Sequence, residues 1–275
     1  MLRSMTVMAL VAASVGLSAQ NRNGRGDSFG QPADTWCAET DRWNTRDRTT
    51  CDVREETLTV SSLDVDTGGN GGIHVRGVGG SASHVRFRIV AHGRSDADAP
   101  DLAKAIDIST NDGRIRARGP RTSGGEGWSV DVEIESPRDQ PLTLNTNNGG
   151  IRIEEVTGRT RFGTENGGVS LTNVSGDVRG RTTNGGLSVS LTGQRWEGSG
   201  LDVETTNGGV TMTLPDGYNA SLSAETTNGG LNIDFPVTVQ GRLSSVNRHI
   251  DTTLGSGGPP IHVRTVNGGV RIAKR

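Results

Sequence analysis

The five histidines are the first residues to test for chemistry, because imidazole is both a metal ligand and a general base. They are His74, His84, His92, His249 and His262. No two of them have the H-E-x-x-H or H-x-x-x-H spacing that places two imidazoles on one helix face. We therefore predict solvated histidines, no metal site and no cofactor.

Motifs for nucleophilic or phosphate chemistry are also missing from the sequence. It contains neither a G-x-S-x-G elbow nor a Walker A lysine. Two adjacent carboxylate pairs occur, Glu55–Glu56 and Glu154–Glu155. Neighbouring residues on a strand point to opposite faces, so neither pair converges on one substrate. We predict no catalytic residues and no enzymatic activity.

Two short motifs have a simpler explanation in composition. The segment Gly68–Gly72 is similar to calcium-binding nonapeptides, but these need an aspartate at a fixed phase, and His74 or its polar equivalents fill that phase here. The tripeptide Arg25-Gly26-Asp27 matches the one recognised by animal cell-adhesion receptors, yet arginine, glycine and aspartate are all frequent in this chain. We assign neither motif a role.

The chain has two cysteines, Cys37 and Cys51. In an exported protein an even number of cysteines favours a disulfide over metal binding. The bridge would close a loop of about 15 residues, for which the chain-entropy model gives about 3 kcal/mol.

An internal repeat determines the predicted architecture. Asn-Gly-Gly occurs seven times, and a threonine stands two positions before six of the copies. We predict structural turns at these asparagines, because asparagine and glycine tolerate positive φ: Asn70, Asn148, Asn166, Asn184, Asn207, Asn228 and Asn267. The last interval, from Asn228 to Asn267, predicts two units with one degenerate copy between them.

Every copy continues as apolar–polar–apolar, as in Val169-Ser170-Leu171 and Leu187-Ser188-Val189. This period-2 alternation predicts strands with one buried face, and it argues against disorder. Pro215-Asp216-Gly217 predicts a longer corner, and Gly255–Pro260 predicts a turn before the last coil.

Two architectures fit a repeat of about 20 residues. In a single-stranded β-helix, or β-solenoid, each unit is one coil and equivalent side chains stack in ladders. In an antiparallel meander or sandwich, each Asn-Gly closes a hairpin. The near-constant period and the recurring Thr-x-Asn-Gly-Gly favour the solenoid, and its narrow core explains an apolar content of only 31%. Residues 98–106 are predicted to form one short helix.

The first residues predict an exported chain. Arg3 precedes the apolar run Met5–Leu17, and small residues lead to a cleavage site near Ala19. We assign residues 1–19 to a signal peptide, 20–50 to a loose polar lead-in tied down by the cysteines, and 51–275 to the solenoid. No later apolar stretch is long enough to predict a transmembrane helix, and the formal charge of −2 does not predict nucleic-acid binding.

The repeat Thr-x-Asn-Gly-Gly-aliphatic-x-aliphatic behind a signal peptide resembles the bacterial "putative adhesin" domain family of unknown function. Cys51–Glu55, the stretch Ala99–Ala103 and the closing Thr265–Ile272 share this resemblance, which covers roughly residues 50–275. It implies a β-helical fold and a cell-envelope or surface setting. The family has no established catalytic residues to carry over.

Three classes of function remain open. The preferred one is an exported, non-catalytic adhesin-like binding or scaffolding module, periplasmic or on the cell surface, with an unknown protein or glycan partner. A β-helical polysaccharide-acting enzyme would need charged side chains clustered on consecutive coils. The outward positions Arg152, Ser170, Ser188, Thr211 and Asn232 are mostly uncharged instead. A sensory or regulatory ectodomain would need a membrane tether.

Overall fold

The computed structural model describes residues 29–41, 48–95, 97–235 and 248–275. The chain divides into two compact units, residues 1–31 and 32–275. All helices and strands described below belong to the second unit. The predicted signal peptide and the Arg25-Gly26-Asp27 motif lie outside the described residues.

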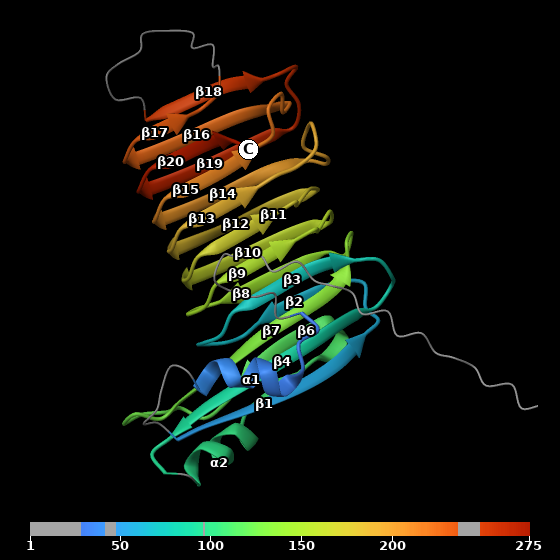
Figure 1. Cartoon of the computed structure of the whole chain (residues 1–275), viewed down its shortest axis with the longest axis vertical. Helices are drawn as coiled ribbons and strands as arrows, with labels where there is room; N and C mark the ends of the chain where they lie inside the picture. The colour runs from blue at the N-terminus through green and yellow to red at the C-terminus, as the bar shows by residue number, and fades with distance from the viewer. Residues whose placement is uncertain (1–28, 42–47, 96, 236–247) are drawn as a thin grey trace, which may run out of the picture. The chain divides into compact units, whose positions relative to one another are not determined.

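The described residues of the second unit form two ten-stranded sheets (Figure 1). Sheet A contains, in spatial order, β1 (Arg48–Leu58), β4 (Ser83–Gly93), β7 (Gly127–Pro137), β3 (Ile73–Val78), β9 (Ile151–Glu154), β11 (Val169–Thr172), β13 (Leu187–Ser190), β15 (Val210–Leu214), β20 (Val270–Lys274) and β17 (Leu231–Ile233). Sheet B contains β18 (His249–Leu254), β16 (Ala220–Asn228), β19 (Pro260–Asn267), β14 (Gly200–Asn207), β12 (Asp177–Asn184), β10 (Arg159–Asn166), β8 (Leu142–Thr146), β2 (Leu63–Asp66), β6 (Arg114–Arg118) and β5 (Asp107–Ser109).

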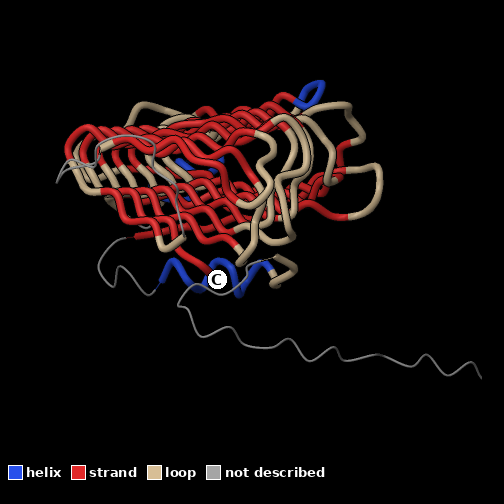
Figure 2. The backbone as a smooth tube through the Cα atoms, turned by 90° about the horizontal axis from the view of Figure 1, so that it is seen from above, coloured by secondary structure: helices blue, strands red, loops and turns tan. Residues whose placement is uncertain are grey.

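Each regular coil gives one strand to each sheet. β10 runs into the Asn166 corner and continues as β11, and the next coil repeats this path with β12 and β13. Neighbouring coils pair in parallel and in register, with Thr164 opposite Thr182 and Val169 opposite Leu187. Figure 2 shows the sheets as two facing layers joined by loops. The predicted solenoid is confirmed.

The core lies between the two sheets. The first aliphatic residue after Gly-Gly is buried in six copies and half-buried at Leu231, which lies on the edge strand β17. Val178, Leu201 and Val203 of sheet B face them and are at most 1% exposed. The predicted alternation therefore places one aliphatic row of each sheet inside the coil.

Antiparallel strands flank the parallel coils. β1, β4 and β7 pair antiparallel in sheet A, as do β5 with β6 and β18 with β16 in sheet B. The antiparallel pairing that we considered as an alternative is thus restricted to the two ends of the stack. Such ends matter because an uncovered strand edge can pair with another chain.

In the part of the chain that the structure describes, two α-helices accompany the sheets. α2 (Asp98–Lys104) confirms the predicted short helix, and a 3-10 turn, η1 (Asn111–Gly113), occupies the degenerate repeat. The lead-in differs from the prediction of a loose segment, because it contains α1 (Ala33–Asp41). The helical pattern of α1 is weak in sequence, and long-range contacts of Trp36 and Cys37 hold it in place.

The order of the last coils corrects the sequence prediction. β19 and β20 do not follow β16 and β17 along the stack but lie between these strands and β14 and β15. The described residues between β17 and β19 hold the antiparallel strand β18. The final coil of the sequence is an interior coil in space.

Candidate functional site

The seven repeat asparagines form a continuous side-chain ladder along one edge of the coils. Each Nδ2 donates to the Oδ1 of the next asparagine, over distances of 2.7–3.0 Å, in the order Asn228, Asn267, Asn207, Asn184, Asn166, Asn148, Asn70. Each of the five inner amides donates to one asparagine and accepts from another, so the ladder points in one direction. The in-register backbone pairing of the coils brings these amides within hydrogen-bonding distance.

The repeat threonines lie opposite one another in register, as predicted, but their hydroxyls bind backbone carbonyls rather than each other. Thr182 Oγ1 donates to the Gly167 carbonyl oxygen at 2.7 Å, and Thr205 donates to that of Gly185 at 2.7 Å. These threonines are at most 1% exposed. Each hydroxyl therefore satisfies a corner carbonyl of the neighbouring coil, which a buried polar group requires.

The reason why the repeats require glycine differs from the predicted one. Among the Asn-Gly-Gly glycines, all of which the structure describes, Gly71 alone has a positive φ. At the first glycine of a copy, such as Gly185, an added Cβ would overlap the Gly167 carbonyl oxygen of the neighbouring coil. Close approach of stacked backbones excludes side chains there.

The histidines and carboxylates that could do chemistry are dispersed. His74 lies 3.6 Å from Glu154, and its hydrogen bond is the main cause that lowers the pKa of Glu154. His249 lies 2.8 Å from Asp251 on the outer face of sheet B. No group of three metal-ligating side chains forms among the described residues.

The adjacent carboxylates Glu55 and Glu56 bind different partners, as expected for neighbours on opposite faces of a strand. Glu55 binds Arg86 at 2.9 Å, whereas Glu56 accepts a hydrogen bond from Thr110 at 3.0 Å.

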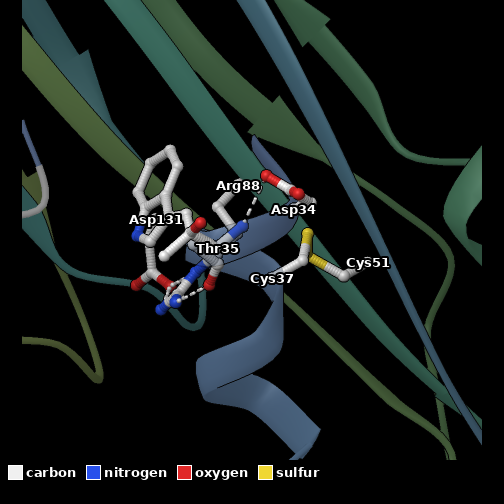
Figure 3. Close-up of a disulfide and its surroundings, with 7 residues drawn as sticks. Asp34, Thr35, Cys37, Cys51, Arg88 and Asp131 are labelled. Carbon is white, nitrogen blue, oxygen red and sulfur yellow. Dashed lines mark hydrogen bonds and ion pairs between the residues drawn. A yellow bond between two sulfur atoms is a disulfide. The ribbon is translucent and has the colours of Figure 1, made fainter. Parts of the chain in front are cut away.

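Helix α1 is fastened to the outer face of sheet A (Figure 3). The disulfide between Cys37 and Cys51 joins it to β1 and confirms the predicted pairing. Trp36 is 3% exposed, and the guanidinium groups of Arg86 and Arg88 lie 4.8 and 5.2 Å from its ring centroid. Arg88 also binds Asp131 at 2.6 Å. Together these contacts anchor α1 to the sheet.

A cluster of charged residues lies on the outer face of sheet B. Arg161 and Arg179 bind the carboxylate of Asp177 at 2.8 and 3.2 Å, and Arg159 approaches it to 3.9 Å. The hydrogen bond from Arg161 is the main cause that lowers the pKa of Asp177. Asp202 and Glu204 of β14 lie opposite Arg179 and Arg181 in register. Opposite charges thus alternate across this face.

The inserted last coil creates a pocket of about 680 Å³ on the loop side of the stack. β19 separates β14 from β16 within sheet B, whereas their preceding loops remain in contact through the bridge between Arg195 and Asn219. The loop before β19 contacts Asn219 through Ser256. The lining residues come from three coils: Gln194–Gly198, Asn219 and Ser256–Pro259.

Asn219 holds the three loops of this pocket together. Its Nδ2 donates to the carbonyl oxygens of Gln194 and Gly217 at 3.0 and 3.2 Å. Its Oδ1 accepts from the backbone N–H and the hydroxyl of Ser256 at 2.7 and 2.9 Å. The amide thereby uses both donors and both acceptor positions. The pocket is therefore preformed.

Arg195 and Glu197 form the charged part of the pocket. The Arg195 Nε lies 2.9 Å from Glu197 Oε1, and the two side chains are 65% and 67% exposed. This hydrogen bond is the main cause that raises the pKa of Arg195, so the guanidinium stays charged. Burial, with a contribution from the charge of Glu197, raises the pKa of the adjacent Tyr218 to about 12. Trp196, which lies between Arg195 and Glu197 in the sequence, is buried. Its Nε1 donates to the Gly176 carbonyl oxygen at 3.1 Å.

Sequence reasoning did not single out this pocket. Its only signals were the longer corner at Pro215-Asp216-Gly217 and the glycine-rich turn before the last coil. Both segments supply loops near the pocket, but their meeting depends on the strand insertion.

The described architecture defines a two-sheet β-solenoid in which parallel coils stack in register. A family model, Toastrack DUF4097, matches residues 103–273. The chain belongs to this family, and the resemblance noted from its repeats is confirmed.

Solved structures give further similarities. A "putative cell adhesion protein" from Clostridium sporogenes ATCC 15579 is 14% identical, with 82% of this chain and 100% of that chain covered and a TM-score of 0.47. A "putative lipid binding protein" from Parabacteroides distasonis ATCC 8503 is 13% identical, covering 82% and 97%, with a TM-score of 0.29. A "putative adhesin" from Bacteroides fragilis NCTC 9343 is 7% identical, covering 82% and 97%, with a TM-score of 0.26. No curated protein sequence matches significantly.

Within the described part of the chain, no helix combines the length and apolarity needed to cross a membrane.

Proposed function

We propose that this chain is an exported, non-catalytic binding module of the cell envelope or surface, and that it engages its partner through the pocket at the inserted coil. The observation that carries this proposal is the fixation of three loops by Asn219 around an open, polar cavity. A preformed site binds without the cost of ordering its own loops. The repeat scaffold beneath it supplies the rigidity.

Two further features support export and binding. The Cys37–Cys51 disulfide is typical of an oxidising compartment. The proteins described as adhesins among the solved structures are consistent with a surface role. The partner belongs to the envelope or the surface and is a protein or a glycan.

A retention experiment tests the proposal. The mature chain, residues 20–275, is immobilised and exposed to solubilised envelope fractions. We expect retention of a defined component by the wild type, and loss of retention in Asn219→Ala, which removes the amide that fixes the loops. Asn232→Ala changes an exposed asparagine on β17 and serves as the control. The proposal is wrong if no component is retained, or if both variants retain it as the wild type does.

A further inference from the structure

The charge arrangement of the pocket points to its ligand class. We propose, building on the binding function above, that the pocket takes a neutral, hydroxyl-rich saccharide unit of an envelope glycan. The argument rests on the groups that the pocket offers, on their net charge and on the shape of the walls.

The pocket presents donors and acceptors side by side. Arg195 uses its Nε on Glu197 Oε1, which leaves its two terminal nitrogens and Glu197 Oε2 without a partner among the described residues. Ser256 donates its hydroxyl proton to Asn219 and keeps acceptor lone pairs. The exposed amide of Gln194 adds one more donor and acceptor group. A ligand must therefore both accept and donate at neighbouring positions, as the vicinal hydroxyls of a sugar do.

The paired charges disfavour ionic ligands. A carboxylate or phosphate that approached Arg195 would also meet the carboxylate of Glu197, and an amine that approached Glu197 would meet the guanidinium. The ligand would then bring a like charge close to one of the two side chains, and like charges repel. A neutral ligand gains charge-assisted hydrogen bonds from both groups, which are stronger than neutral ones, without this repulsion.

The remaining walls suit a small, compact unit. Gly198, Gly257 and Gly258 line the pocket without side chains, and all three have a positive φ. Pro259 adds apolar surface that can contact the C–H face of a sugar ring. The volume of 680 Å³ falls within the range of about 300–1,000 Å³ typical of small-molecule sites.

The test uses an array of neutral oligosaccharides built from glucose, galactose, mannose and N-acetylglucosamine, with uronic-acid and sialylated counterparts. The probe is the mature chain with its disulfide intact. We expect the wild type to bind at least one neutral glycan, and the double variant Arg195→Ala/Glu197→Ala to bind it at least tenfold more weakly in titration calorimetry. Arg264→Ala/Glu225→Ala removes a comparable surface pair, 57% and 43% exposed and 3.2 Å apart, and should bind as the wild type does. Thermal unfolding confirms that both variants fold.

The outcomes separate this inference from the proposed function. Binding of the neutral glycan that is unchanged in Arg195→Ala/Glu197→Ala overturns the site. A preference for the acidic counterparts, or pocket-dependent binding of a peptide library with no glycan bound, overturns the ligand class. In both cases retention of an envelope component by the wild type still supports the binding function. Failure to retain any component refutes the function itself.

Discussion

Asn267 donates a hydrogen bond from Nδ2 to Oδ1 of Asn207 at 2.8 Å, although 60 positions separate the two residues in the chain. Asn228, which lies between them in sequence, donates to Asn267 instead. The ladder thus follows the spatial order of the coils and not their order in the chain.

The ladder should make a measurable contribution to stability. Asn207→Ala removes the bond to Asn184 and the bond from Asn267, both 2.8 Å. At about 0.5–1.5 kcal/mol for each of the two bonds, we expect the free energy of unfolding to fall by about 1–3 kcal/mol in urea denaturation. Asn147→Ala changes an exposed neighbour of the Asn148 corner and should have little effect. Equal losses in both variants would contradict a role of the ladder.

The two glycines of one repeat copy should differ sharply. At Gly185 an added Cβ overlaps the Gly167 carbonyl oxygen, whereas at Gly186 the nearest atom, the Gly209 carbonyl oxygen, lies 3.7 Å away. We expect Gly185→Ala to cost about 1–3 kcal/mol or more through forced backbone displacement, and Gly185→Val to cost at least as much. Gly186→Ala should be tolerated. Thermal denaturation of the three variants decides this, and a tolerated Gly185→Ala would refute close coil stacking.

A charge on the inner face of a coil should destabilise the solenoid strongly. Val169 and Leu187 are each 2% exposed between the sheets. Val169→Asp or Leu187→Asp leaves an unpaired carboxylate there, and we expect a loss of about 3–5 kcal/mol. Ser188→Asp places the same charge on the adjacent outward position, where the effect should stay within about 0.5 kcal/mol. Chemical denaturation measures both, and similar unfolding midpoints would exclude the inward placement.

The disulfide should stabilise the N-terminal end of the stack. Cys37 and Cys51 are 14 positions apart, and for a loop of this size the chain-entropy model gives about 3 kcal/mol. We expect Cys37→Ser/Cys51→Ser to unfold at a lower temperature than the wild type and to be insensitive to reductant. The wild type should shift to the variant's unfolding temperature when reductant is added. A wild type unaffected by complete reduction would contradict the prediction.

Acid should weaken the arginine cluster around Asp177. Its pKa is lowered from the ordinary value of 3.8, first by the hydrogen bond from Arg161 and then by the charges of Arg161 and Arg179. A carboxylate with a lowered pKa in the folded state stabilises fully above its unfolded pKa, and this stabilisation is lost as the pH falls through the folded value. We therefore expect Asp177→Asn to be less stable than the wild type at neutral pH, with the difference vanishing in strong acid.

Denaturation series across pH measure this difference. Asp202→Asn, on the neighbouring strand, is the control for losing a surface carboxylate. A gap between Asp177→Asn and the wild type that persists at low pH would show that the ion pairs are not its cause.

The sequence by itself determined the coil. Val169-Ser170-Leu171 and its counterparts alternate with period 2, and the shared phase of Asn166 and Asn184 predicts coils in register. These are local signals, because strand geometry turns alternation directly into one buried face. The same reasoning predicted the Cys37–Cys51 bridge and the short helix that became α2.

Only the tertiary structure decided the order of the coils and the pocket that depends on it. Nothing local in Pro260–Asn267 distinguishes a coil that stacks last from one inserted between β14 and β16, because equivalent coils offer nearly identical edges to a parallel partner. The meeting of Arg195, Asn219 and Ser256 follows from that choice. The need for glycine at Gly185 also follows from the tertiary structure, because the carbonyl that excludes a side chain there belongs to a different coil.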